Sequence, residues 1–181
     1  MCGIIGYIGH QKASPILING LLRLEYRGYD SAGISTIEKN GLSVMKDKGR
    51  VKNLYNLDGI DSLEGTIGIA HTRWATNGEA NLVNAHPHKV GKITLVHNGI
   101  IENYQELKDK LVRKGYTFYS ETDTEVAVKL IDYYYKKYEG TPVDAINHAL
   151  VRIRGSYALA IMFRDYPEEI YVARKDSPMI L

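Results

Sequence analysis

Short apolar runs alternate along this chain with longer stretches in which apolar residues recur every third or fourth position. The short runs, several of them bounded by glycine, predict seven strands. These strands are residues 2–9, 32–38, 42–48, 66–72, 93–97, 156–164 and 169–174. The dipeptide Asn40-Gly41 is a strong turn signal, so the second and third strands are predicted to form a β-hairpin. The final residues, 177–181, are typical of the start of another strand.

Helical spacing of apolar residues predicts helices between these strands. Ser14-Pro15 is typical of an N-cap followed by proline at the first helical position, and apolar residues continue at helical spacing through 16–24. Further helices are expected around 50–57 and at 102–114, 124–138 and 142–153. We expect Thr122 or Asp123 to cap the third of these four helices, and Thr141-Pro142 to open the last.

The order of elements is strands, then helices, then strands, rather than a strict alternation of the two. Such segregation favours an α+β fold in which sheets stack and helices cover their outer faces. With 181 residues and no linker, repeat or low-complexity segment, the chain is expected to form one domain, residues 1–181. Because 177–181 reads as the start of a strand, we expect this domain to be truncated at its C-terminus.

Composition and charge narrow the possible partners. The net charge is +2 and the basic residues are mixed with acids, which gives no electrostatic argument for nucleic-acid or membrane binding. No apolar run approaches the roughly 18–20 residues of a membrane helix, and the apolar start lacks the features of a signal peptide. The single cysteine excludes an internal disulfide. A cytoplasmic protein is therefore expected.

That single cysteine is Cys2, and its position is the most informative feature of the sequence. Removal of Met1 would leave one residue that carries both a thiol and a free α-amine. The reference pKa values of these groups are roughly 8.5 and 7.7–8.0, so both lie near physiological pH. Such a residue can act as a nucleophile with its own base. By position alone, however, a small buried hydrophobic residue is the more common interpretation.

The long polar loop at 73–92 contains a second candidate group. Arg73 and Trp74 lead into the turn Thr76-Asn77-Gly78, and arginine is the side chain best suited to hold a carboxylate with two hydrogen bonds. A solvated arginine is the structural alternative. After the next strand, Asn98 and Gly99 could bind an oxyanion through an amide and a backbone N–H, or could form a simple turn.

Other polar residues are ambiguous. Asp123 begins a predicted helix, where carboxylates are favoured for structural reasons alone, although it could also bind a substrate ammonium group. Four histidines, His71, His86, His88 and His97, raise the possibility of zinc. They lack the spacing and the cysteine or carboxylate partners of a zinc site, so no metal is expected.

Taken together, these segments resemble the glutaminase domain of the glutamine–fructose-6-phosphate aminotransferases, which are class II glutamine amidotransferases. The matching segments, in the family's order, are 2–6, 24–33, 68–76, 84–88, 96–103 and 120–125. The resemblance implies an N-terminal nucleophile hydrolase fold, a four-layer αββα sandwich of two antiparallel sheets. It also implies the glutaminase half of an enzyme that converts fructose 6-phosphate and glutamine to glucosamine 6-phosphate and glutamate.

The same resemblance implies three catalytic residues. Cys2 would attack the side-chain amide of glutamine, with its own α-amine as the base. Asn98 and the N–H of Gly99 would hold the oxyanion. A thioester and ammonia would result, and water would then release glutamate.

Further residues are implied in substrate binding. Arg73 would hold the α-carboxylate of glutamine and Asp123 its α-ammonium. Trp74 would belong to a loop that covers the site, and Thr76 and His86 are similar to pocket residues of the family. Asn77 departs from the family, which commonly has histidine there.

The implied partners are glutamine, the sugar-isomerase domains of a longer enzyme and a second subunit in a homodimer, with no cofactor. The Trp74-Ala75 pair disfavours the related amidophosphoribosyltransferases, which tend to carry tyrosine and serine there. The alternative from another class is a truncated, non-catalytic fragment that only binds glutamine or a partner chain.

Overall fold

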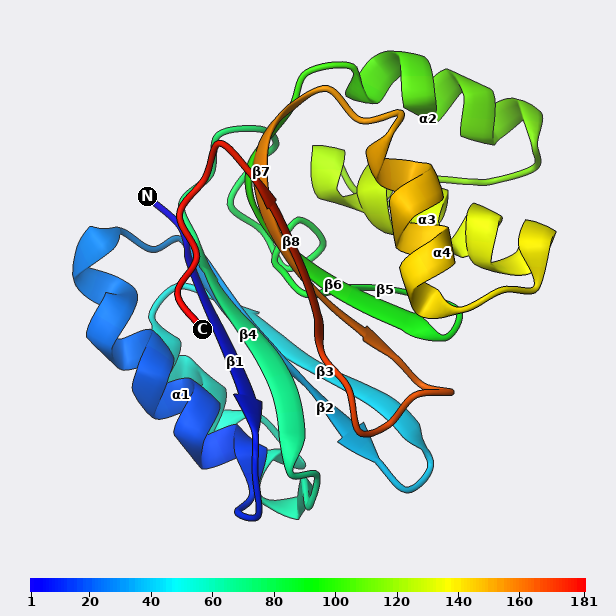
Figure 1. Cartoon of the computed structure of the whole chain (residues 1–181). Coiled ribbons are helices and arrows are strands. Elements are labelled where there is room, and N and C mark those ends of the chain that lie inside the picture. Colours follow the sequence, from blue (N-terminus) through cyan, green and yellow to red (C-terminus); the bar gives the residue numbers. More distant parts are fainter.

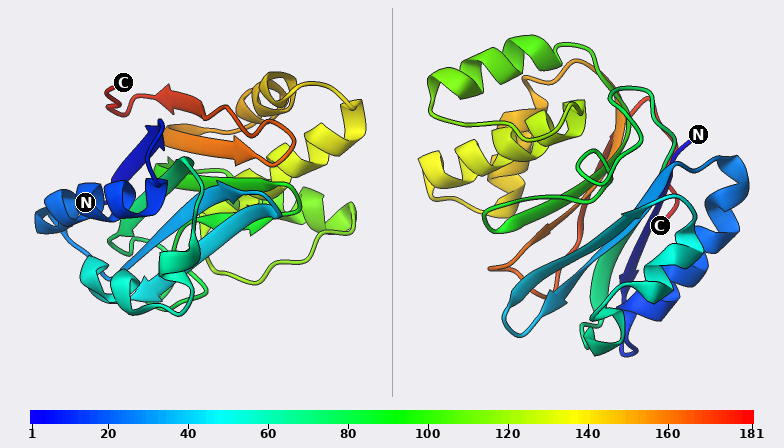
Figure 2. Two further views of the ribbon diagram at one scale, coloured as in Figure 1. Left: turned by 90° about the horizontal axis from the view of Figure 1, so that it is seen from below. Right: turned by 180° about the vertical axis from the view of Figure 1, so that it is seen from behind.

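The computed structural model describes residues 1–181, and its framework is a pair of four-stranded sheets that face each other (Figure 1). Every strand pair in both sheets is antiparallel. Helix α1 lies on the outer side of one sheet, and α2, α3 and α4 lie on the outer side of the other (Figure 2). The expected α+β sandwich of two antiparallel sheets between helices is therefore confirmed.

The first sheet has the order β1-β4-β2-β3. Its strands are β1 (Gly3–Ile8), β2 (Ser31–Glu38), β3 (Gly41–Lys48) and β4 (Ile67–Arg73). Helix α1 (Ala13–Leu24) covers it, with 3-10 turns η1 (Glu25–Arg27), η2 (Val51–Asn56) and η3 (Ile60–Ser62). The second sheet has the order β5-β6-β7-β8. Its strands are β5 (His88–Val90), β6 (Ile93–Ile101), β7 (Gly155–Phe163) and β8 (Tyr171–Lys175). Its helices are α2 (Tyr104–Arg113), α3 (Asp123–Tyr138) and α4 (Pro142–Leu150).

Three apolar clusters hold the four layers of the sandwich together, one between each pair of adjacent layers. The largest has 19 buried residues and joins α2, α3 and α4 to the second sheet, while a cluster of 11 joins α1 to the first sheet. A third cluster, of six residues, lies between the sheets and includes Ile69 of β4 and Val96 of β6. Alternate residues of β4 and β6 therefore face opposite layers. This alternation decides which side chains can meet at the site.

Several predicted element ends are shifted. The hairpin loop is Lys39-Asn40, because Gly41 already pairs with Glu38. Helix α1 begins at Ala13, so the prediction that Ser14 is its N-cap is wrong. Residues 177–181 form no strand, which corrects the expectation of another strand there.

The predicted caps of the later helices are present. Thr122 accepts a hydrogen bond from the N–H of Glu125 at the start of α3. Thr141 and Asp144 form a reciprocal capping box at the start of α4. None of the helices has both the length and the apolar character that crossing a membrane requires.

Candidate active site

Cys2 lies immediately before β1, next to the end of β4. The register pairs Gly3 with Thr72, which carries Cys2 to the start of the loop after Arg73. Its Sγ accepts a hydrogen bond from the N–H of Trp74 at 3.2 Å and lies 3.5 Å from the carbonyl oxygen of the same residue. Burial raises the pKa of the Cys2 thiol, while the Trp74 N–H lowers it in part. The thiol therefore needs a base to become a nucleophile.

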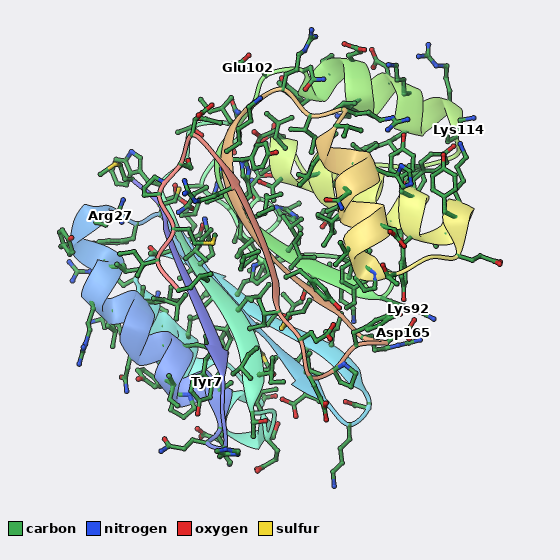
Figure 3. All side chains as sticks on the ribbon, in the orientation of Figure 1. Tyr7, Arg27, Lys92, Glu102, Lys114 and Asp165 are labelled. Carbon is green, nitrogen blue, oxygen red and sulfur yellow. The ribbon has the colours of Figure 1, made fainter.

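The N-terminal amine lies one residue before this thiol. The α-amine of Met1 donates to the carbonyl of Arg27 at 2.6 Å, and the Met1 side chain is largely exposed. Figure 3 labels Arg27 close to the N-terminus, beyond the end of α1. While Met1 is attached, the nitrogen of Cys2 is a peptide amide without basic character. Removal of Met1 would create the base next to the sulfur.

Asn98 connects Cys2 to the second sheet. It lies within β6, not in a turn, so the simple-turn interpretation of Asn98-Gly99 is wrong. Its Nδ2 donates to the backbone carbonyl of Cys2 at 3.3 Å, and its Oδ1 lies 2.9 Å from Nε2 of His71. The amide of Asn98 thus lies between Cys2, immediately before β1, and His71 of β4.

Gly99 occupies a position that only glycine fits. Its φ is +116°, and a Cβ would lie 2.2 Å from the carbonyl oxygen of Ser156 and 2.9 Å from Cα of Tyr157. Glycine is therefore required here by the close packing of the β7 backbone against β6.

The Gly99→Ala substitution should consequently destabilise the protein by about 2–3 kcal/mol, through the positive φ and the clash together. Thermal unfolding would measure the loss. Gly115→Ala is a matched control, because Gly115 has a φ of +94° and nothing within 4 Å of an added Cβ. A Gly99→Ala protein no less stable than Gly115→Ala would contradict the argument.

Arg73 is not the solvated arginine of the structural alternative, because it is only 4% exposed. Its guanidinium donates to the carbonyls of Glu79 at 3.0 Å and Gly78 at 3.3 Å, and also to that of Asn77. It lies 3.8 Å from the carboxylate of Asp30. The side chain therefore holds the loop after β4 in shape.

Asp123 is the first residue of α3 and is buried. Its Oδ2 accepts the N–H of Ile101 at 2.8 Å, which ties α3 to the end of β6. Its Oδ1 lies 3.9 Å from Nδ1 of His97, and that nitrogen is 2.9 Å from Oγ1 of Thr124. Asp123 thus has a structural role at the start of α3. Its partner Ile101 lies three residues after Asn98 on β6.

The three remaining predicted residues, Trp74, Thr76 and His86, differ from one another in exposure. The ring of Trp74 is half-exposed and packs on Gly28, where an added Cβ would lie 2.9 Å from Cε3. Thr76 is exposed on the same loop. His86 is buried behind His71, with ring centroids 4.2 Å apart and nearly parallel. The structure therefore places Trp74 and Asn98 each in contact with Cys2, while His86 contacts the ring of His71.

Asn98 also lines a groove of about 690 Å³. Its walls are mostly apolar residues of β1, β7 and β8 and of the C-terminal segment, and Tyr7 and Arg27 also line it (Figure 3). Cys2, Arg73 and Asp123 are not among its lining residues. Hence Asn98 is accessible from the groove between β1, an edge strand of the first sheet, and β8, an edge strand of the second.

Two residues were missed by sequence reasoning. Asp30 accepts the N–H of Ala75 and the hydroxyl of Ser31, and faces Arg73, so it helps to fix the loop after β4. His71 contacts Asn98 directly. Alternation along β4 places His71 on the same face as Arg73, and this signal was available in the sequence. Asp30 follows η1 in an irregular segment. It lies within the matching segment 24–33, but no local pattern distinguished it from its neighbours.

Three buried histidines near the site give the stability a defined pH dependence. Burial lowers the pKa of His71 to about 3, and lowers those of His86 and His88 well below the usual value. In the unfolded chain these rings would take up protons near pH 6.5. The stability from the neutral rings is therefore complete above about pH 6.5 and falls as the pH is lowered toward the folded-state values.

We expect each of these histidines to remove up to about 1.4 kcal/mol of unfolding free energy per pH unit in that window. Urea unfolding at about pH 7.5 and about pH 5 would measure the change. His88→Gln should show a shallower pH dependence than the parent protein. Equal urea midpoints at both pH values would contradict this prediction.

Comparison with known proteins identifies the family to which this chain is similar. A family model described as "Glutamine amidotransferase domain" matches residues 75–178. Among curated relatives, proteins from Bacteroides thetaiotaomicron and Pyrococcus horikoshii, both named glutamine–fructose-6-phosphate aminotransferase (isomerizing), are 55% and 53% identical to this chain. Each alignment covers 100% of this chain and 30% of the relative. This chain thus spans about a third of the relatives' length.

Solved structures share the fold. The glutamine phosphoribosylpyrophosphate amidotransferase from B. subtilis matches with a TM-score of 0.81 and 29% identity, over 96% of this chain and 37% of that one. A glutamine aminotransferase class-II domain protein from Silicibacter pomeroyi matches with a TM-score of 0.65 and 16% identity, over 99% of this chain and 79% of that one. The second likeness concerns the fold alone.

Proposed function

The chain belongs to the family of glutamine amidotransferase domains, and from this premise we propose that Cys2 hydrolyses glutamine to glutamate and ammonia. The observation that carries the proposal is the position of the Asn98 amide, whose Nδ2 lies 3.3 Å from the backbone carbonyl of Cys2. A donor next to the nucleophile is what an acyl-transfer site requires, because negative charge develops on the substrate oxygen.

The proposed reaction has two steps. With Met1 removed, the α-amine of Cys2 takes the thiol proton, and the sulfur attacks the side-chain carbonyl carbon of glutamine. Asn98 Nδ2 and the N–H of Gly99 stabilise the resulting oxyanion. The intermediate collapses as the C–N bond breaks, and ammonia leaves with the proton from the amine. Water then attacks the thioester, which breaks the C–S bond, releases glutamate and restores the thiol.

For substrate binding, we propose that Arg73 binds the α-carboxylate of glutamine and Asp123 its α-ammonium. Opposite charges of this kind select a free amino acid over an internal residue of a peptide. Trp74 and Thr76, on the loop after β4, would close over the substrate. His86 would support the pocket from behind, through His71. This hydrolysis calls for no metal or organic cofactor.

We further propose that the ammonia serves the transfer to fructose 6-phosphate that gives glucosamine 6-phosphate, as the names of the relatives suggest. In this proposal, residues 1–181 are the glutaminase domain of a longer cytoplasmic enzyme that also carries isomerase domains and forms a homodimer. This chain by itself provides only the first half-reaction, and neither nucleic acid nor a membrane is a proposed partner.

The N-terminus provides the direct test. One preparation should expose Cys2 by cleavage of a removable leader, and the second should retain Met1, with intact mass to verify each. Glutamate release from glutamine should be at least roughly 100-fold faster with Cys2 exposed, because the second preparation lacks the base. Equal, negligible release from both would favour the alternative, a chain that at most binds glutamine.

A further inference from the structure

We propose that His71 is a positioning residue that orients the side-chain amide of Asn98, so that its N–H donors face the nucleophile and not the interior of the sandwich. This inference rests on the proposed function of Asn98. The observation behind it is the contact between Nε2 of His71 and Oδ1 of Asn98 at 2.9 Å. The contact crosses from β4 in one sheet to β6 in the other.

The amide of asparagine has two ends, and only one of them can stabilise an oxyanion. With Oδ1 against His71, Nδ2 points to Cys2 and is available as a donor. Rotation of the amide by half a turn would place Oδ1 next to the carbonyl oxygen of Cys2. An oxygen in that place would repel the developing negative charge. The orientation of this one amide therefore decides whether the site is catalytic.

The proton on the imidazole of His71 determines which orientation is stable. When Nε2 carries the proton, it donates to Oδ1 of Asn98, and only an acceptor nitrogen, Nδ1, is left without a hydrogen-bond partner. When Nδ1 carries the proton, a buried N–H has no partner. Buried N–H groups without an acceptor are rare because they are costly. The fully buried ring is therefore held as the Nε2–H form.

The surroundings also restrict the ring itself. His71 has no exposed surface, and the ring of His86 stacks on it at a centroid distance of 4.2 Å. Burial lowers the pKa of His71 to about 3, so the ring stays neutral over the working pH range. A rigid, neutral donor of this kind is well suited to hold a partner amide in one orientation.

Replacement of His71 by phenylalanine should lower kcat about tenfold or more, with KM changed less than about twofold, because Arg73 and Asp123, which are proposed to bind the charged groups of glutamine, are untouched. His71→Gln retains an N–H donor and should restore most of the rate. Ser35→Ala is the matched control, since it removes another buried cross-sheet hydrogen bond, from Ser35 Oγ to Thr94 Oγ1 at 3.1 Å. It should leave kcat close to that of the parent protein.

Two measurements separate positioning from a merely structural role. In the Asn98→Ala background, His71→Phe should cause no further loss of kcat, whereas an additional tenfold loss would overturn the proposal. Independently of activity, long-range ¹H–¹⁵N spectra of histidine-labelled protein should assign the proton of His71 to Nε2. Assignment of the proton to Nδ1 would also overturn it.

All kinetic measurements should use the full chain with Cys2 exposed, below the unfolding temperature of each variant. If that protein releases no glutamate, the proposed function fails, and the spectrum still tests the orientation of the amide. If it is active and His71→Phe retains full kcat, the positioning role alone is overturned. If His71→Phe does not fold, the kinetics of His71→Gln and the histidine spectrum still test the positioning role.

Discussion

Cys2→Ala, prepared with its N-terminal residue exposed, should lose glutamate release from glutamine by roughly a thousandfold or more. No other residue of the chain can form the thioester, because Cys2 is the only cysteine. The substitution removes one sulfur atom that contacts the backbone of Trp74, so the fold should persist. Glutamate formation, followed with an excess of glutamine, is the measurement.

The matched control is Cys2→Ser, which retains the α-amine and offers a hydroxyl in place of the thiol. It should fold as the parent protein does and also release glutamate very slowly, because a hydroxyl ionises far less readily than a thiol. Denatured samples quenched during turnover should carry the added mass of a glutamyl group on the parent protein alone. Substantial release from Cys2→Ala would overturn the assignment of the nucleophile.

Most of the fold could be predicted because its elements are encoded locally. Apolar runs predicted every strand except β5, which lies in the segment expected to be a polar loop. The caps at Thr122 and Thr141 placed the starts of α3 and α4 to within a residue. The errors occur where pairing with a distant strand determines whether a segment is extended. Asn98-Gly99 reads locally as a turn, yet it continues β6, because β7 supplies strand partners as far as Ile101. Residues 177–181 have a strand-like composition but no partner strand.

The site could be predicted only in part, because contacts between the two sheets leave little trace in sequence. Cys2 and Asn98 were candidates by their own chemistry, the family resemblance implied their roles, and the structure adds that one hydrogen bond links them. The position of His86 behind His71 depends on the path of the loop before β5. The carbonyl contacts of Arg73 likewise follow from the shape of the loop after β4, which local patterns do not fix.

Asn98→Ala should lower kcat by roughly 100–1,000-fold while KM changes little, because the lost donor acts on charge that is present only in the transition state. Steady-state kinetics with glutamine would test both parameters. Asn98→Asp is the informative second variant. It retains the size of the side chain and an oxygen that can accept from His71, but it replaces the donor next to Cys2 with a carboxylate oxygen.

Asn98→Asp should therefore be at least as slow as Asn98→Ala, although it preserves the cross-sheet contact. That order separates the oxyanion role from a packing role, because loss of packing alone would make alanine the worse substitution. A raised KM with an unchanged kcat in both variants would instead assign Asn98 to ground-state binding of glutamine. The stabilisation of the oxyanion would then rest on Gly99, whose backbone is held in place by β7.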